Sequence, residues 1–194
     1  LSLTMRAIIA ASLTAAMLAA APAWSAQGKM AVGAFSGLKP GDALNDWQPL
    51  TFRKIERHTS YSLVSENGIT VVKAQAQASA SGLIRNLSID LKQFPILSWR
   101  WKVENIVQKA DPATKSGDDY PARIYITFAF DRSKLSAGER LKYGAAKLLY
   151  GEYPPLAAIN YIWDGKTPLG TVLPNAYTAR VKMIVVQSGA DKLN

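Results

Sequence analysis

Two stretches of the chain alternate between apolar and polar residues, at 96–103 and at 123–130, and a long polar segment separates them. Strict alternation is typical of a strand that buries one face. The segment between them, 104–122, is too polar for a core and too long for an ordinary hairpin turn. The sequence therefore predicts two strands joined by a long loop. The apolar members of the first stretch are Leu97, Trp99, Trp101 and Val103.

A turn pair predicts a β-hairpin in the N-terminal half of the chain. Asn67-Gly68 lies between apolar stretches at 61–64 and 69–74. Asn-Gly is favoured where both central residues of a tight turn take a positive φ. Apolar patterning predicts further strands at 82–91, 157–163 and 179–187.

The sequence predicts one helix. Ser136 and Glu139 form a capping box, in which the serine caps the helix start and the glutamate reaches back to it. The apolar residues that then fall on one helical face are Leu141, Ala145, Leu148 and Leu149. The chain is thus predicted to be mainly β: an antiparallel β-sandwich, jelly-roll-like, with one inserted α-helix near 136–150.

The first 25 residues have the features of an export signal. Arg6 precedes a mostly apolar run at 7–21, and small residues follow it. This order is typical of a Sec-type signal peptide, with cleavage expected near Ala23 to Ala26, and a retained membrane anchor is the alternative. We expect a periplasmic or secreted protein whose residues 26–194 form one β-sandwich domain, with no transmembrane segment after signal cleavage.

The amino-acid composition limits the classes of chemistry and of binding partner that this chain can have. The chain has no cysteine, so disulfides and thiolate chemistry cannot contribute. Its net charge is +9, but the basic residues are scattered and accompany no nucleic-acid motif. The expected partner is therefore a glycan or an anionic cell-envelope polymer, not nucleic acid. His58 is the single histidine and is expected on an exposed turn. Nucleophilic triads and zinc sites normally draw on histidine, and a single histidine without an evident partner does not indicate either. No common catalytic motif is present.

Several segments of the chain resemble a bacterial family known as domain of unknown function 3047. These segments are LSWRWKV, GDDYPARIYITF, NYIWD and ARVKMIVVQSG. The resemblance covers 35–189 and is most specific at 117–123. It implies an exported protein with a β-sandwich core and implies no activity. Members of the family continue beyond the strand that ends here at Gln187, so the resemblance also implies that C-terminal strands are missing.

The long loop carries the first candidate site. Asp118 and Asp119 are candidate ligands for calcium, the one metal ion left open, or acceptors for sugar hydroxyls, and Tyr120 offers a ring for sugar stacking. Adjacent residues on extended chain point in opposite directions, which does not suit a glycosidase pair. The alternative is a loop whose aspartates cap turns and pair with Arg123 or Lys115.

A basic sheet face is the second candidate. Six polar residues lie opposite the apolar faces of their predicted strands: Arg100, Lys102, Arg123, Tyr125, Arg180 and Lys182. If these strands share a sheet, their guanidinium groups suit carboxylate, sulfate or phosphate ligands. The alternative is a solvated outer face. Trp99 and Trp101 are expected in the core, whereas Trp163 is a candidate ligand contact because it ends a strand.

These patterns predict a protein that binds a polar, anionic glycan or envelope polymer. The candidate binding residues are Arg100, Asp118, Asp119, Tyr120, Arg123, Tyr125, Trp163 and Arg180. One alternative is a carbohydrate-active hydrolase or lyase on the same face, where Arg123 neutralises a uronate carboxylate and Tyr125 serves as the base. The other is an envelope structural protein without a small ligand. No cofactor is expected.

Overall fold

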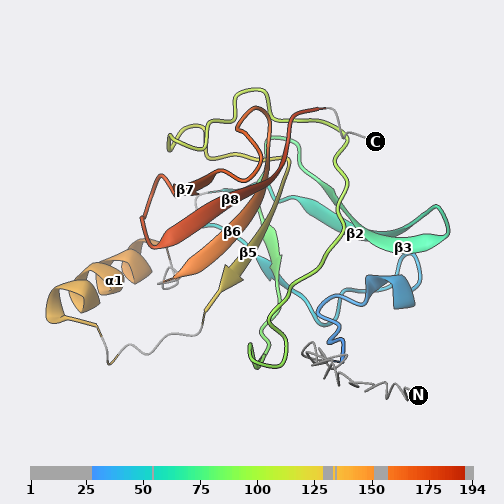
Figure 1. The fold of residues 1–194 in the computed structure, drawn as a ribbon, viewed down its shortest axis with the longest axis horizontal. Coiled ribbons are helices and arrows are strands. Elements are labelled where there is room, and N and C mark those ends of the chain that lie inside the picture. The colour runs from blue at the N-terminus through green and yellow to red at the C-terminus, as the bar shows by residue number, and fades with distance from the viewer. Residues whose placement is uncertain (1–27, 54, 129–132, 134, 151–156, 191–194) are drawn as a thin grey trace, which may run out of the picture.

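The computed structural model describes residues 28–190, apart from 54, 129–132, 134 and 151–156 (Figure 1). The side chains of 146–150 are also outside the description. The predicted signal segment, the end of the predicted strand at 123–130, and the side chains of Leu148 and Leu149 therefore lie outside the described residues. Within those residues, no helix has the length and apolar character needed to cross a membrane.

The described residues are mainly β with one α-helix, as predicted. The strands are β1 (Gln48–Leu50), β2 (Ser60–Glu66), β3 (Ile69–Gln75), β4 (Gly82–Ile84), β5 (Ala122–Thr127), β6 (Ala158–Asp164), β7 (Val172–Pro174) and β8 (Val181–Ser188). The helices are η1, a short 3-10 turn (Phe35–Gly37), and α1 (Ala137–Tyr150). The strands form three sheets: β1-β4, β2-β3 and the four-stranded sheet β5-β6-β8-β7. The β2-β3 hairpin and α1 lie on opposite sides of the molecule (Figure 1).

The predicted hairpin is confirmed. β2 and β3 pair antiparallel over their whole length, and Glu66 and Ile69 form the last pair before the turn. Asn67 and Gly68 have φ values of 51° and 77°, so both turn residues adopt the positive φ that this tight turn requires.

The predicted helix is also confirmed, together with its capping box. The Ser136 N–H and hydroxyl donate to the Glu139 carboxylate at 3.1 and 2.8 Å, and the Glu139 N–H donates to Ser136 Oγ at 3.3 Å. Glu139 also pairs with Arg180. Leu141 is 77% exposed, so the predicted apolar helix face does not bury its first member.

The four-stranded sheet is mixed, not wholly antiparallel as predicted. β5 pairs antiparallel with β6 and β7 pairs antiparallel with β8, but β6 and β8 run parallel. The reason is the short strand β7 between them in sequence. β7 runs opposite to β6, and β8 runs opposite to β7. Because β8 inserts between β6 and β7, it lies beside β6 and runs in the same direction.

Strand register defines two faces of this sheet, because directly paired residues project to the same side. The core face comprises Arg123, Tyr125, Asn160, Ile162, Leu173, Val181, Met183 and Val185. The tryptophan face comprises Ile124, Ile126, Ile159, Tyr161, Trp163, Lys182 and Ile184. Ile162, Met183 and Val185 form the buried cluster on the core face together with Tyr120 from the long loop.

The predicted strand at 96–103 is wrong, although its alternation has a structural meaning. No residue of this segment joins a sheet. Its tryptophans instead cover the tryptophan face, with Trp99 5.1 Å from Tyr161 and Trp101 6.0 Å from Trp163, measured between ring centres. The alternation therefore reflects packing of Trp99, Trp101 and Val103 on one side of an extended segment, as expected for the tryptophans, whereas Leu97 stays 38% exposed.

The predicted strand at 82–91 is largely wrong as well. Only Gly82–Ile84 is a strand, because its partner β1 offers three residues for pairing. The apolar residues that follow stay exposed, with Leu91 at 59%.

Candidate functional site

Arg123 is the centre of the candidate site. It lies on the core face of β5, directly opposite Ile162 of β6. Its Nη1 is 3.5 Å from Oδ1 of Asp118, and its guanidinium carbon lies 5.4 Å from the ring centre of Tyr120 and 5.7 Å from that of Tyr125. The side chain of Arg123 is 31% exposed. A guanidinium group this close to two rings gains cation–π stabilisation while part of it stays accessible.

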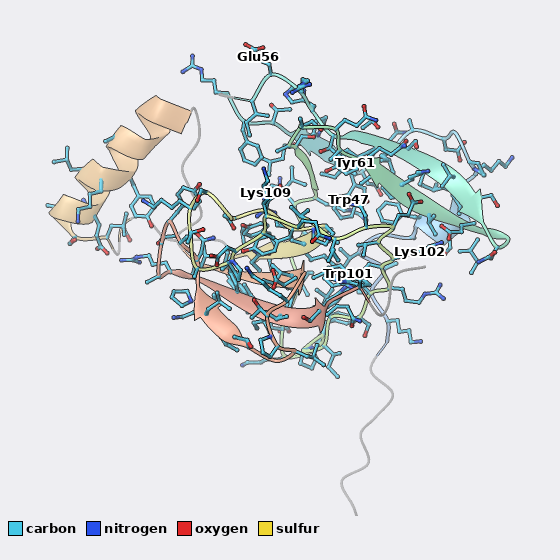
Figure 2. The ribbon with its side chains drawn as sticks, turned by 90° about the horizontal axis from the view of Figure 1, so that it is seen from above. Trp47, Glu56, Tyr61, Trp101, Lys102 and Lys109 are labelled. Carbon is cyan, nitrogen blue, oxygen red and sulfur yellow. The ribbon has the colours of Figure 1, made fainter. Side chains whose placement is uncertain are left out.

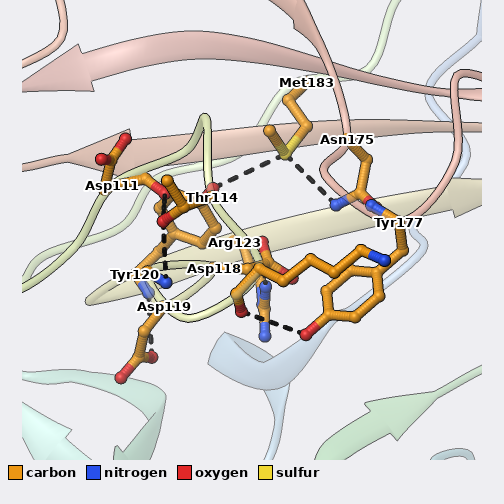
Figure 3. Close-up of polar contacts among 11 residues, drawn as sticks. Asp111, Thr114, Asp118, Asp119, Tyr120, Arg123, Asn175, Tyr177 and Met183 are labelled. Atoms are coloured by element: carbon orange, nitrogen blue, oxygen red, sulfur yellow. Dashed lines mark hydrogen bonds and ion pairs between the residues drawn. The ribbon is translucent and has the colours of Figure 1, made fainter.

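The loop that brings Asp118 to Arg123 is held by its own hydrogen bonds (Figure 3). The Asp111 N–H donates to the Gly117 carbonyl at 2.8 Å, and the Gly117 N–H donates to Thr114 Oγ1 at 3.2 Å. A Cβ on Gly117 would lie 2.7 Å from the Asp111 nitrogen and 2.8 Å from its carbonyl oxygen. The tight loop therefore requires glycine at this position.

Asp119 has a different role from Asp118. Its Oδ1 accepts the Tyr120 N–H at 3.0 Å, and its own N–H donates to the Gly117 carbonyl at 2.7 Å. The two aspartates thus have separate partners, one on the loop backbone and one on Arg123. Among the described residues, no three His, Cys, Asp or Glu side chains gather where they could hold a metal ion.

Tyr120 is the buried ring of the site, packed beneath the Arg123 guanidinium in the core. It is 7% exposed, so its ring does not present a face for sugar stacking as the sequence predicted. Its hydroxyl donates to the Met183 sulfur at 3.6 Å, and Asn175 Nδ2 donates to the same sulfur at 3.5 Å. Burial raises the pKa of Tyr120, and the nearby negative charge of Asp118 raises it further. Tyr120 therefore stays a neutral hydrogen-bond donor.

Tyr125 presents the accessible ring of the site. It is 44% exposed and lies two residues beyond Arg123 on the same face of β5. Desolvation of its hydroxyl raises the pKa of Tyr125, although the positive charge of Arg123 opposes the shift.

Two buried polar residues of β6, Asn160 and Asp164, were not among the sequence-based candidates. Asn160 is fully buried between Tyr125 and Met183 on the core face, and neither of its side-chain polar atoms has a hydrogen-bond partner within the described part of the chain. Asp164 Oδ2 accepts the N–H groups of Lys166 and Thr167 at 3.0 and 2.6 Å. The available signal was a pair of polar residues at the two ends of the segment NYIWD.

Trp163 is not available as a ligand contact. It is 3% exposed, its Nε1 donates to the Gly189 carbonyl at 3.0 Å, and its ring packs on Trp101. The prediction failed because the segment 96–103 covers the end of β6.

The predicted basic face does not form. Lys182 pairs with Ile159 and so lies on the tryptophan face, opposite to Arg123. Arg180 precedes β8 and pairs with Glu139 of α1. The parallel pairing of β6 and β8 fixes this register, which the pattern within each strand could not reveal.

The other two predicted basic residues also point elsewhere. Lys102 pairs with Glu66 of β2. Arg100 is exposed between Trp99 and Trp101, whose rings pack on the tryptophan face. Of the predicted basic face, only Arg123 and Tyr125 share one side of one sheet.

The described fold is thus that of a mainly β protein with one partly exposed arginine held between two tyrosines. The chain matches the family model described as "Protein of unknown function (DUF3047)" over residues 45–194. This match covers most of the chain, so the chain belongs to that family. No curated protein and no solved structure matches the chain.

Proposed function

We propose that this chain is an exported protein that binds a polar, anionic glycan or cell-envelope polymer at the Arg123 site (Asp118, Tyr120, Arg123 and Tyr125). The observation that carries the proposal is the Arg123 guanidinium, held between two tyrosine rings and 31% exposed. A guanidinium group fixed in this way can donate two parallel hydrogen bonds to a carboxylate or sulfate. The half-exposed ring of Tyr125 adds a surface on which a sugar ring can stack.

Charge supports an anionic ligand. The net charge of +9, which becomes +8 when Arg6 is removed with residues 1–25, favours approach of a polyanion from a distance. Asp118 does not forbid such a ligand, because its side chain is only 13% exposed and faces Arg123. A bound carboxylate would meet the accessible side of the guanidinium, while Asp118 holds the other side in place.

The lyase alternative receives less support than binding. A general base works best when its pKa is near the operating pH, so a tyrosine base needs a lowered pKa. Burial shifts the pKa of Tyr125 upward instead. A hydrolase would need a second free carboxylate near Asp118, and the Asp119 carboxylate accepts a loop N–H.

The test is a binding screen on the full chain with two groups of polymers. One group carries uronic acids, such as polygalacturonate and alginate, and the other is uncharged, such as dextran and pullulan. We expect binding of the first group that weakens as salt increases, because salt screens the attraction. Product analysis on the same samples distinguishes binding from cleavage, and Tyr125→Phe should preserve binding. Absence of binding to every uronate polymer would favour an envelope structural protein.

Export and the sandwich architecture belong to the same proposal. We propose that residues 1–25 direct the chain to the periplasm or outside the cell and are removed. Their composition supports this. N-terminal sequencing of the protein recovered from the periplasmic fraction is the test, and recovery of uncleaved chain from the cytoplasm contradicts it.

We also propose that the two-stranded sheets pack against the four-stranded sheet as a jelly-roll-like sandwich, which a crystal structure would test.

A further inference from the structure

A hollow of about 590 Å³, lined by none of the residues of the Arg123 site, lies between the segment 42–51, the chain around β2, and β4. Its volume falls within the range of about 300 to 1,000 Å³ that is usual for small-ligand pockets. The side chains and backbone that line it are Asp42, Ala43, Leu44, Asn45, Trp47, Pro49, Thr51, His58, Thr59, Tyr61, Ser62, Ser81, Gly82 and Leu83. Trp47 and Tyr61, both labelled in Figure 2, supply its aromatic surface.

Both aromatic rings are held in place by other parts of the chain. The ring of Trp47 packs on Phe35 of η1 with 5.5 Å between ring centres, and the backbone N–H of Trp47 donates to the Leu44 carbonyl at 2.9 Å. The Tyr61 hydroxyl donates to the Ser81 carbonyl at 2.8 Å. Each ring is half-buried. Rings fixed before binding reduce the entropy cost of capturing a ligand.

The polar groups of the hollow suit a ligand with hydroxyl groups. The polar residues that line the hollow include Asp42, Asn45, His58, Thr59 and Ser62. His58 is exposed, as the sequence predicted, and has no hydrogen-bond partner among the described residues. These groups can both donate and accept hydrogen bonds, as sugar hydroxyls require.

The charge of the hollow differs from that of the Arg123 site. Among the described residues that line it there is no lysine or arginine, and Asp42 contributes a negative charge. An anionic ligand would therefore meet the negative charge of Asp42 and find no countercharge among these lining residues, although the positive charge of Arg123 reaches the Tyr61 hydroxyl. The combination of two fixed rings, neutral hydrogen-bonding groups and one carboxylate favours an uncharged ligand.

We propose that this hollow binds an uncharged sugar ring or a comparable polyol, stacked on Trp47 and Tyr61. The proposal does not rest on the function of the Arg123 site, because none of the four residues of that site lines the hollow. Either one can fail while the other stands.

The test is a nuclear magnetic resonance titration of the full chain, in which Trp47→Phe identifies the Trp47 indole signal. The probes are glucose, galactose, mannose, N-acetylglucosamine and their disaccharides, with glucuronate as the charged comparison. We expect at least one neutral sugar to shift the Trp47 signal below about 10 mM, ten times a millimolar Kd, and glucuronate to bind more weakly. If no neutral sugar shifts this signal, or if glucuronate binds better, the proposal is wrong.

Substitutions then place the binding in the hollow. Trp47→Ala should weaken binding at least about tenfold, since a stacked ring contributes a large contact area. Phe52→Ala is the matched control, because Phe52 is 45% exposed nearby but does not line the hollow. Asn45→Ala changes an exposed residue and avoids any effect on folding, and we expect it to weaken binding about three- to tenfold. Unchanged affinity in both Trp47→Ala and Asn45→Ala overturns the proposal.

Discussion

Arg123 and Asp118 face each other where the long loop joins β5, with 3.5 Å between Nη1 and Oδ1. Oδ1 of Asp118 is buried and accepts no hydrogen bond from the described residues, so Arg123 is its countercharge. The rings of Tyr120 and Tyr125 hold the guanidinium in the same position. One arginine thereby links the loop to the sheet and also presents a partly exposed cation.

This relationship predicts a measurable coupling between the two residues. Arg123→Ala leaves a mostly buried carboxylate without its countercharge, so the free energy of unfolding should fall by more than Asp118→Asn alone would cost. Combining the substitutions should recover part of the loss, with a coupling of about 1 kcal/mol because Arg123 is partly solvated. Urea unfolding of the four proteins measures it. Strictly additive effects would mean that the interaction between Arg123 and Asp118 contributes nothing to the free energy of unfolding.

Asp164 should make the fold sensitive to acid. Burial opposes ionisation of this carboxyl, but hydrogen bonds from the N–H groups of Lys166 and Thr167 outweigh burial and hold the pKa of Asp164 below its usual 3.8. A lowered folded-state pKa stabilises the fold above pH 3.8, and this contribution is lost as the pH falls through the folded value. Asp164→Asn should be less stable at pH 7 and lose less stability below pH 4. Chemical unfolding across this range checks both, and an unaltered acid profile would contradict the assignment.

Trp99 should contribute strongly to stability although it belongs to no strand. Its ring lies 5.1 Å from that of Tyr161 and 5.6 Å from that of Trp101. Trp99→Ala should lower the free energy of unfolding by about 3 kcal/mol. Ile96→Ala in the same segment is the control and should change it by less than about 0.5 kcal/mol, since Ile96 is 73% exposed. Equal effects of the two substitutions would show that the segment does not cover the sheet.

Gly117 and Gly144 should respond to alanine in opposite directions. A Cβ on Gly117 would overlap backbone atoms of Asp111, so Gly117→Ala should displace the loop and destabilise the protein by about 1–3 kcal/mol. Gly144 lies inside α1 with nothing within 4 Å of an added Cβ, so Gly144→Ala should stabilise the helix by up to about 1 kcal/mol. Thermal unfolding compares the signs. A stabilising Gly117→Ala would refute the tight loop.

The elements that could be predicted from the sequence are those specified by neighbouring residues. Asn67-Gly68 determines its turn locally, and the capping bonds of Ser136 and Glu139 span three residues. The alternation at 96–103 was misread because it reports which side of a segment is buried. It does not report whether the backbone pairs with another strand, and here the tryptophans pack on a sheet without joining it.

The site was predicted in part for a similar reason. The pairing of Arg123 with Asp118 was one of the alternatives for the loop, since the two residues are close in sequence. The placement of Lys182 depends on the parallel pairing of β6 with β8, which is a long-range property. The polar residue Asn160 was overlooked because its polarity does not reveal whether it is buried, and only the three-dimensional structure shows it buried beside Met183.

The central claim is that Arg123 binds an anionic polymer, and calorimetric titration with a short oligomer of galacturonate tests it most directly. Hydrogen bonds to a charged group contribute about 1.5–3 kcal/mol, so Arg123→Ala should weaken binding by roughly ten- to a hundredfold. Arg57→Ala removes the same charge from an exposed position and should bind like the unaltered chain. Arg123→Lys, which keeps the charge but loses the planar donor pair, should fall between them. Equal affinity of Arg123→Ala and Arg57→Ala would contradict the account.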